Sequence, residues 1–261
     1  MAKVLGDPGR YVSQQAVNKH RRFVLWAFFG GCFISFGLGM FLMYDFSVPK
    51  HSLITGIVLP TVFFLVIIYI ARIVDRKMDT YEKERLNFLK GATGEFMVAR
   101  KIDDLPDEFC VIHDLATPFG NLDHVVIGPT GVFVLETKNW RGVIASDGLG
   151  GILHNGRKHL KDGIKPLIGR MMNVRDKIGT LCDIKEDLPY FNALMVFPSA
   201  WVEVKWGQTG RARCIHDEQL WNCIVEVKSE RRLNAGEIDR LAHAFGALAS
   251  MDREFKGNVK S

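Results

Sequence analysis

The chain has 261 residues, enough for one medium domain with accessory segments or for two small domains. Its hydrophobic fraction of 48% is ordinary for a globular protein. The formal net charge of +5 comes mainly from residues 1–22. The net charge of the whole chain is therefore no evidence for nucleic-acid binding, which has to rest on local basic patches.

Two uncharged apolar runs follow the basic N-terminus. They extend from Phe23 to Tyr44 and from Leu53 to Ala71, and each is close to the roughly 20 residues that cross a bilayer core as a helix. A signal peptide is disfavoured, because the first run is too long and a second run follows almost at once. We therefore expect a transmembrane helical hairpin over residues 23–71; the alternative is a buried helical hairpin in a soluble core.

Lysine and arginine residues flank the predicted hairpin on its outer ends. They are frequent in residues 1–22 and again just after the second run, whereas the linker between the runs carries only Lys50 and His51. By the positive-inside rule both ends of the hairpin face the cytoplasm. The sequence therefore predicts a multi-pass membrane protein that contacts lipid, with both termini and the remaining domain in the cytoplasm.

The segment after the second run is charged and rich in helix-forming residues. We expect a juxtamembrane helix over residues 72–90, a short break at Gly91 and Gly94, and a second helix from about Gly94 to Ile102. The domain proper is expected over residues 91–253, with a short tail over residues 254–261.

Strand patterns begin after Pro106 and alternate with helical ones. Strands are expected at "FCVIHDL", Leu122–Ile127, Gly131–Thr137, "GVIASDG" with "GGILHNG", "ALMVFPS" and "RARCIHD", and helices at "GIKPLIGRMMNVRDKIGTL", "EQLWNCIVEV" and "NAGEIDRLAHAFGALAS". This order predicts an α/β sandwich, a mixed sheet flanked by helices.

The stretch "NLDHVVIGPTGVFVLETKNW" reads as a β-hairpin that carries charges where apolar residues are expected. Glu136 and Lys138 share one strand face, because side chains at i and i+2 point to the same side. If the turn has two residues, Gly128 pairs with Gly131 and Asp123 lies opposite Glu136. A type I turn with a bulge at Gly131 would shift this register by one residue.

Opposed carboxylates in an antiparallel pair lie close, with Cβ atoms about 4.5 to 5.5 Å apart. They repel unless a proton or a cation lies between them, so the arrangement is costly as pure structure and favourable as a divalent metal site. Hard oxygen ligands indicate magnesium or manganese. The alternative is an exposed strand end with a Glu/Lys pair and an unrelated Asp.

Gly94-Glu95, "LDHVVIGPTGVFVLETKN" and the following Gly142 together resemble the nuclease-related domain, called NERD, a branch of the PD-(D/E)XK nuclease superfamily. The resemblance implies a restriction-endonuclease-like fold, which here follows the two membrane helices expected from the apolar runs. It also implies a hydrolase that cleaves phosphodiester bonds of nucleic acid, with DNA as the expected substrate and Mg²⁺ or Mn²⁺ as cofactor.

Carried over position by position, the resemblance gives each charged residue a role. Asp123 and Glu136 hold the metal, with the Thr137 carbonyl as a third ligand. Lys138 orients or deprotonates the attacking water, and Glu95 is a supporting acid on the first helix of the domain.

One stretch departs from the family pattern. Many members carry Asn-Pro-Leu-x-Gln on the helix after the core strands, whereas the matching stretch here is "KPLIG", Lys165–Gly169, which lacks the Gln. This departure leaves a second hypothesis open: a catalytically weak or inactive nuclease-fold module that binds nucleic acid or a protein at the membrane.

A basic run lies close in sequence to the predicted site. It is either a solvated face or a set of phosphate contacts. The candidate nucleic-acid-binding residues are Arg157, Lys158, Lys161, Lys165 and Arg170.

Overall fold

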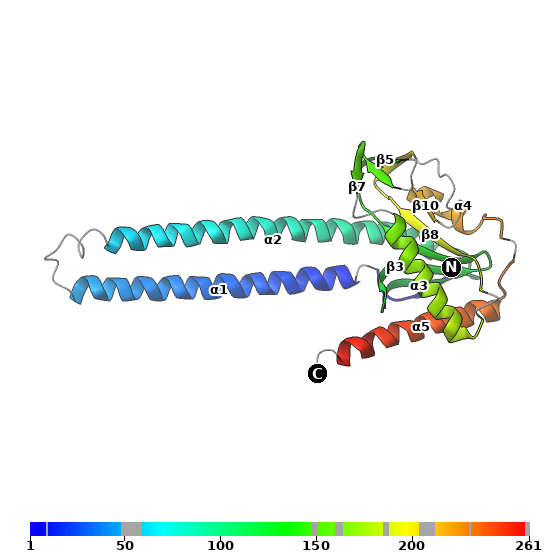
Figure 1. Cartoon of the computed structure of the whole chain (residues 1–261), viewed down its shortest axis with the longest axis horizontal. Coiled ribbons are helices and arrows are strands. Elements are labelled where there is room, and N and C mark those ends of the chain that lie inside the picture. The colour runs from blue at the N-terminus through cyan, green and yellow to red at the C-terminus, as the bar shows by residue number, and fades with distance from the viewer. Residues whose placement is uncertain are drawn as a thin grey trace. The chain divides into compact units, whose positions relative to one another are not determined.

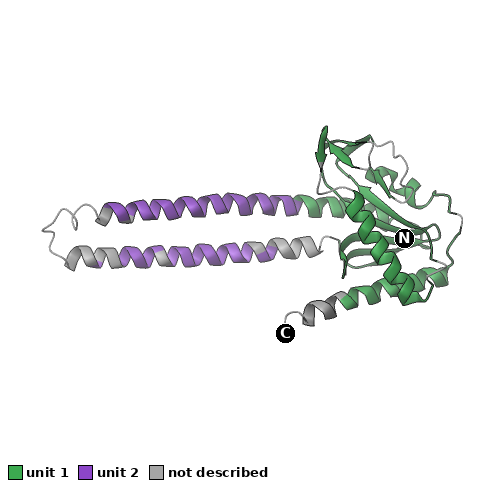
Figure 2. Cartoon of the chain, viewed as in Figure 1, with its two compact units in different colours: residues 1–11, 90–261 green, residues 12–89 purple. Residues whose placement is uncertain are grey.

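The structure is a computed structural model that describes residues 1–8, 10–47, 59–147, 151–159, 164–184, 188–203, 212–229 and 231–258. Figure 1 shows its elements in chain order. The chain divides into two units, one of residues 1–11 and 90–261 and the other of residues 12–89, coloured separately in Figure 2.

The unit of residues 12–89 consists of parts of two long helices, α1 (Arg10–Ser47) and α2 (Leu59–Asp103). The rings of Phe23 on α1 and Tyr81 on α2 lie 6.0 Å apart between centroids. Among the described residues one segment, His20–Gly39, is long and apolar enough to cross a membrane, judged by length and composition alone. The second predicted run, Leu53–Ala71, begins outside the described residues, so its membrane span stays a prediction.

The helix α2 runs through Gly91 and Gly94 without interruption, so the predicted break there is wrong. Gly94 has a packing role instead, because a Cβ at this position would lie 2.6 Å from the Cβ of Asn139. Glycine here allows the helix to approach the end of a strand, and the predicted juxtamembrane helix and the first domain helix are one continuous helix.

The core of the larger unit is a six-stranded mixed sheet, which confirms the predicted fold class. Its strand order is β1-β2-β3-β4-β8-β10. β2, β3 and β4 are antiparallel neighbours, whereas β1 pairs with β2, and β8 with both β4 and β10, in parallel. The bounds are β1 (Lys3–Leu5), β2 (Cys110–Thr117), β3 (Gly120–Gly128), β4 (Gly131–Thr137), β8 (Phe191–Val196) and β10 (Ala212–Ile215).

Helices cover both faces of this sheet. The helices α3 (Ile164–Cys182) and α5 (Ala235–Asn258) contribute to one apolar cluster, and the end of α2 with α4 (Leu220–Ile224) contributes to the other. A short 3-10 helix, η2 (Asp217–Gln219), precedes α4. β4 supplies both clusters by alternation: Val132 and Val134 face α3 and α5, whereas Phe133 and Leu135 face α2 and α4. Each fully buried apolar side chain of this kind stabilises the fold by about 1.5–3 kcal/mol.

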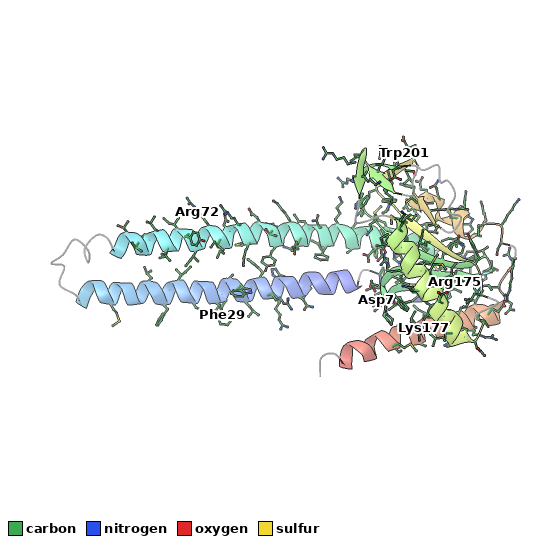
Figure 3. The ribbon with its side chains drawn as sticks, viewed as in Figure 1. Asp7, Phe29, Arg72, Arg175, Lys177 and Trp201 are labelled. Carbon is green, nitrogen blue, oxygen red and sulfur yellow. The ribbon has the colours of Figure 1, made fainter. Side chains whose placement is uncertain are left out.

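A smaller four-stranded sheet has the order β7-β6-β5-β9. Its bounds are β5 (Gly142–Ser146), β6 (Ile152–His154), β7 (Arg157–His159) and β9 (Ala200–Glu203). The antiparallel pairing of β5 with β6 confirms the predicted strand pair. Trp201 on β9 is 70% exposed and is labelled in Figure 3.

A capping box formed by Asn234 and Glu237 begins α5. The backbone N–H of Glu237 donates to Asn234 Oδ1 at 3.0 Å, and the N–H of Asn234 donates to Glu237 Oε2 at 2.8 Å. The reciprocal pair satisfies two donors that the first helical turn leaves without backbone partners.

Candidate active site

The hairpin of β3 and β4 has the register predicted from a two-residue turn. Gly128 pairs with Gly131, and His124 pairs with Leu135. Gly131 has φ +132, and a Cβ there would lie 2.7 Å from the Tyr190 carbonyl oxygen. Glycine is therefore required at the turn that sets which residues meet at the open end of the hairpin.

Asp123 lies where the backbone ladder between β3 and β4 has ended. The last paired residues are His124 and Leu135, and beyond them the N–H of Thr137 donates to Asp123 Oδ2 at 2.7 Å. On the other side of Asp123, in β2, Asp114 adopts φ +51. Left-handed backbone at a residue other than glycine stores strain, which accumulates at functional sites.

Burial holds the pKa of Asp123 well above its ordinary value, and the charges of Glu136 and Glu95 raise it further. The Thr137 N–H and the Lys138 ammonium act on this pKa in the opposite direction. The three acids predicted from sequence are thus within electrostatic reach of one another. A carboxylate crowded in this way favours a proton or a cation beside it.

Glu95 reaches the site because α2 approaches the end of β4. The close contact of Gly94 with Asn139 is accompanied by two hydrogen bonds: Asn139 Nδ2 donates to the Lys90 carbonyl, and Ser199 Oγ donates to Asn139 Oδ1, both at 2.6 Å. Glu95 is 8% exposed. Asn139 is a residue of the site that no sequence pattern indicated; its position directly after Lys138 was the available signal.

Glu136 and Lys138 point to the same side of β4, as predicted. Lys138 Nζ donates to Glu136 Oε1 at 3.0 Å. The second oxygen, Glu136 Oε2, accepts from Arg170 Nη2 at 2.7 Å, and Arg170 Nη1 donates to the Asn121 carbonyl at 2.9 Å. The Glu136 carboxylate is therefore held between two cations.

Arg170 was expected among the phosphate contacts, and its guanidinium is instead engaged with Glu136. It comes from α3, one residue after Gly169, the position at which the family pattern predicts Gln. The α3 face of the sheet is the face toward which Val132 and Val134 point, so an even-numbered residue of β4 faces this helix. Residue spacing alone could not show this pairing, because it depends on how α3 crosses the sheet.

The other candidate phosphate-binding residues differ in their exposure and in their ion pairs. Arg157 on β7 and Lys165 on α3 are exposed. Lys158 Nζ lies 2.9 Å from Asp147 Oδ2, so part of its charge is compensated. Lys161 lies outside the described residues.

Two buried histidines form a network with Asp103. His113 Nδ1 and His124 Nδ1 lie 2.8 Å apart, and His113 Nε2 lies 2.9 Å from Asp103 Oδ1. Burial, together with the neighbouring His113, lowers the pKa of His124 to about 3. His124 is therefore neutral at physiological pH and serves as part of the structural network.

The donor chemistry at the strand ends fits a hard divalent cation. Asp123 and Glu136 supply carboxylate oxygens, which Mg²⁺ and Mn²⁺ prefer. In the described part of the chain, however, no cluster of three or more His, Cys, Asp or Glu side chains has an arrangement that could hold a metal ion. A cation here would need backbone or water oxygens as further ligands, and it would have to share Glu136 with Arg170.

A mixed sheet flanked by helices, with an Asp and a Glu-x-Lys meeting at the ends of two strands, defines a nuclease-like domain. Residues 90–198 match the profile of the nuclease-related domain, NERD, so the chain carries this domain. It is also similar to an uncharacterized protein of Bacillus anthracis, pXO1-01, with 38% identity over 73 residues, which is 26% of this chain and 34% of the relative. The chain thus spans about a third of that relative's length. No solved structure matches.

Proposed function

We propose that the chain is a divalent-metal-dependent nuclease that hydrolyses phosphodiester bonds in nucleic acid, with DNA as the favoured substrate. The observation that carries the proposal is the meeting of Asp123, Glu136 and Lys138 at the ends of β3 and β4 within a nuclease-related domain. Hydrolysis of a phosphodiester needs positive charge beside a non-bridging oxygen and a positioned water. This strand end offers residues for both.

In this proposal Asp123 and Glu136 hold Mg²⁺ or Mn²⁺, with the Thr137 carbonyl as a third ligand. When bound, the ion supplies positive charge to the phosphate oxygen. The raised pKa of Asp123, caused by burial and then by Glu136 and Glu95, supports a cation beside this carboxylate. The Thr137 N–H keeps Asp123 Oδ2 in a fixed position for this task.

Lys138 serves the attacking water. Its Nζ lies 3.0 Å from Glu136 Oε1, and its side chain is 23% exposed, so the ammonium lies beside the metal ligand and remains open to solvent. From this position the ammonium orients the water; to act as the base, Lys138 must first lose a proton to solvent, and its neutral amine then accepts a proton from the water. Glu95 supports the site through its charge on Asp123.

Arg157, Lys158, Lys161 and Lys165 remain the proposed phosphate contacts. Arg157 and Lys165 carry this part of the proposal best, because both are exposed. Binding that depends on such contacts weakens steeply as salt rises, because bound phosphates release counterions.

The second candidate is a binding module on the nuclease fold without substantial activity. Two observations favour it: both oxygens of Glu136 already accept from cations, and the Gln of the family pattern is absent at Gly169. A guanidinium that cannot be displaced would leave the fold able to bind nucleic acid or a protein and unable to cut.

We also propose that the helical unit anchors the chain in a membrane with the nuclease domain on the cytoplasmic side. Many apolar side chains of α1 are exposed, among them Trp26, Phe28 and Phe29, the last labelled in Figure 3. Exposed apolar patches of this kind are unusual in water. Membrane fractionation and reporter fusions at the two termini test the location; a chain that stays in the soluble fraction contradicts it.

The activity is tested with the full chain in detergent, incubated with labelled DNA or RNA and Mg²⁺ or Mn²⁺. The nuclease proposal expects cleavage that stops when the metal is chelated and that is lost in Glu136→Ala. Wild-type protein that binds nucleic acid and cuts neither substrate would favour the binding module.

A further inference from the structure

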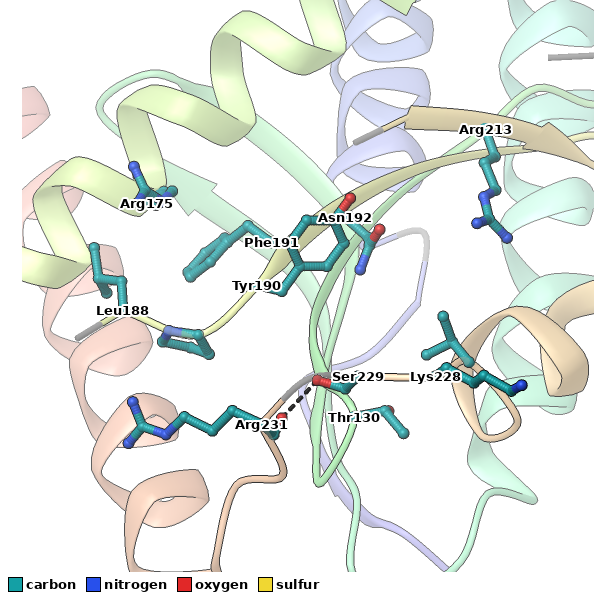
Figure 4. Close-up of a pocket in the computed structure, with 12 residues that line it drawn as sticks. Thr130, Arg175, Leu188, Tyr190, Phe191, Asn192, Arg213, Lys228, Ser229 and Arg231 are labelled. Atoms are coloured by element: carbon teal, nitrogen blue, oxygen red, sulfur yellow. Dashed lines mark hydrogen bonds between the residues drawn. The ribbon is translucent and has the colours of Figure 1, made fainter. Parts of the chain in front are cut away.

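A cavity lies at the opposite end of the β4–β8 strand pair from Glu136. Its volume is about 560 Å³, and Figure 4 shows the residues around it. It lies beside Thr130 in the β3–β4 turn and Phe191 at the start of β8. Phe191 pairs with Val132, whereas Met195 pairs with Glu136, so four residues of strand separate the two places. Because a strand rises about 3.3 Å per residue, this separation places the cavity well away from the candidate active site.

Among the described residues, the charged side chains that line this cavity are all basic. They are Arg175 on α3, Arg213 on β10, and Lys228 and Arg231 in the segment between α4 and α5, and none of the described lining residues is Asp or Glu. Arg231 is paired with Glu237, and Arg175 Nη1 lies 3.4 Å from Asp176 Oδ1, so two of the four charges are partly compensated. The cavity retains an excess of positive charge, which an anion stabilises.

A buried amide also lines the cavity. Asn192 is 7% exposed, and its Nδ2 has no hydrogen-bond partner among the described residues. Buried donors are almost always paired, and one that is not calls for an explanation such as a missing ligand. An acceptor oxygen entering the cavity would satisfy this amide.

An aromatic ring completes the lining. Tyr190 is 44% exposed and borders the cavity (Figure 4). Nucleobases stack on exposed aromatic rings of this kind. The volume is within the range of about 300–1,000 Å³ that is typical of small-molecule sites, and it exceeds what a single phosphate needs.

We propose that this cavity binds a nucleotide. Its phosphates contact Arg213 and Lys228, with Arg175 as a further cation, because guanidinium and ammonium groups recognise phosphate through charge-assisted hydrogen bonds. Its base packs against Tyr190, and an acceptor oxygen takes the hydrogen bond of Asn192. The site is independent of the metal site and of catalysis.

Calorimetry on the full chain in the presence of a metal chelator tests this inference with ATP, tripolyphosphate and adenosine as probes. We expect ATP to bind, tripolyphosphate to bind at least tenfold more weakly, and adenosine to show no binding. The double variant Arg213→Gln/Lys228→Gln should bind ATP at least tenfold more weakly than the wild type. The matched control Lys177→Gln, on the same helix as Arg175 and outside the cavity lining (Figure 3), should bind as the wild type does.

Two further measurements keep the result interpretable. Thermal unfolding without ligand should be the same for the double variant and the wild type, because Arg213 and Lys228 are exposed. Glu136→Ala should bind ATP normally, which separates this site from the metal site. The inference is overturned if wild-type protein binds no ATP, if the double variant binds it unchanged, or if tripolyphosphate binds as tightly as ATP.

Discussion

Replacing Arg170 by Gln should change metal affinity and stability in opposite directions. The guanidinium makes two hydrogen bonds, to Glu136 Oε2 at 2.7 Å and to the Asn121 carbonyl at 2.9 Å. Hydrogen bonds to charged groups contribute about 1.5–3 kcal/mol each when buried. The Arg170 side chain is 27% exposed, so we expect its loss to lower the free energy of unfolding of the metal-free protein by about 2 kcal/mol in total.

The same change should strengthen metal binding. A divalent cation at Glu136 must displace the guanidinium or tolerate it as a close positive charge. Relief from one charge-assisted bond of about 1.5–3 kcal/mol corresponds to a decrease in the Mn²⁺ dissociation constant of about tenfold to a hundredfold. Calorimetry with Mn²⁺ on the full chain measures this directly, and denaturant unfolding of the metal-free protein measures the stability.

Lys177→Gln is the matched control on the same helix, and it should change neither quantity. An Arg170→Gln variant that binds Mn²⁺ as weakly as the wild type, or more weakly, refutes the competition between guanidinium and metal. A variant with unchanged stability refutes the energetic weight given to the two hydrogen bonds.

Three further predictions follow from the same geometry. Lys138→Ala should abolish cleavage and leave Mn²⁺ binding largely intact, and Asp123→Ala should weaken both, because only the carboxylate is a hard ligand; cleavage assays paired with calorimetry separate the two. Burial and two neighbouring carboxylates raise the pKa of Asp123 in the folded protein, so the metal-free protein should lose stability as pH rises from the ordinary carboxyl value of 3.8 through the higher folded value. Denaturant unfolding across this pH range should show the loss in the wild type. The dependence of stability on pH should be smaller in Asp123→Asn. Gly131→Ala should lower the free energy of unfolding by about 1–3 kcal/mol, because φ is +132 and the new Cβ meets the Tyr190 carbonyl. Gly169→Ala lies in a helix with open space around the new Cβ and should raise the free energy of unfolding by up to about 1 kcal/mol. Equal effects of the two variants in denaturant unfolding contradict this account of the turn.

The hairpin and its charges could be predicted from sequence because they depend on local rules. Strand alternation puts Glu136 and Lys138 on one side, and the turn sets the register that ends at His124 and Leu135. The choice between two registers was open, since Pro129 does not suit the tight hairpin turns. In the structure Gly131 takes the positive φ, and the two-residue register holds.

The helix boundary at Gly94 was wrong for a tertiary reason. Glycine between charged helix formers is a signal for a break, but α2 continues, and the missing side chain is what lets the helix pack against Asn139. β1 was not predicted at all, because three residues, Lys3–Leu5, are too few to show a periodic pattern and form a strand only beside β2.

The contact between Arg170 and Glu136 could not be predicted from local sequence rules either. Arg170 belongs to a basic run that resembles a phosphate-binding segment, and its actual contact depends on the packing of α3 over β4. The same holds for the cavity around Asn192, whose basic residues come from three separate stretches of the chain. Sequence patterns indicated that Asp123, Glu136 and Lys138 meet at the end of the hairpin, but not that Arg170 contacts Glu136.

The most direct test of the central claim is the Mn²⁺ dependence of phosphodiester cleavage by the full chain. If Asp123 and Glu136 hold the ion that cleavage requires, the Mn²⁺ concentration for half-maximal cleavage should match the dissociation constant from calorimetry, and Glu136→Gln should lose cleavage and binding together. Cleavage that persists in this variant, or that needs no metal, would contradict the account, as would tight Mn²⁺ binding by wild-type protein that cuts neither DNA nor RNA.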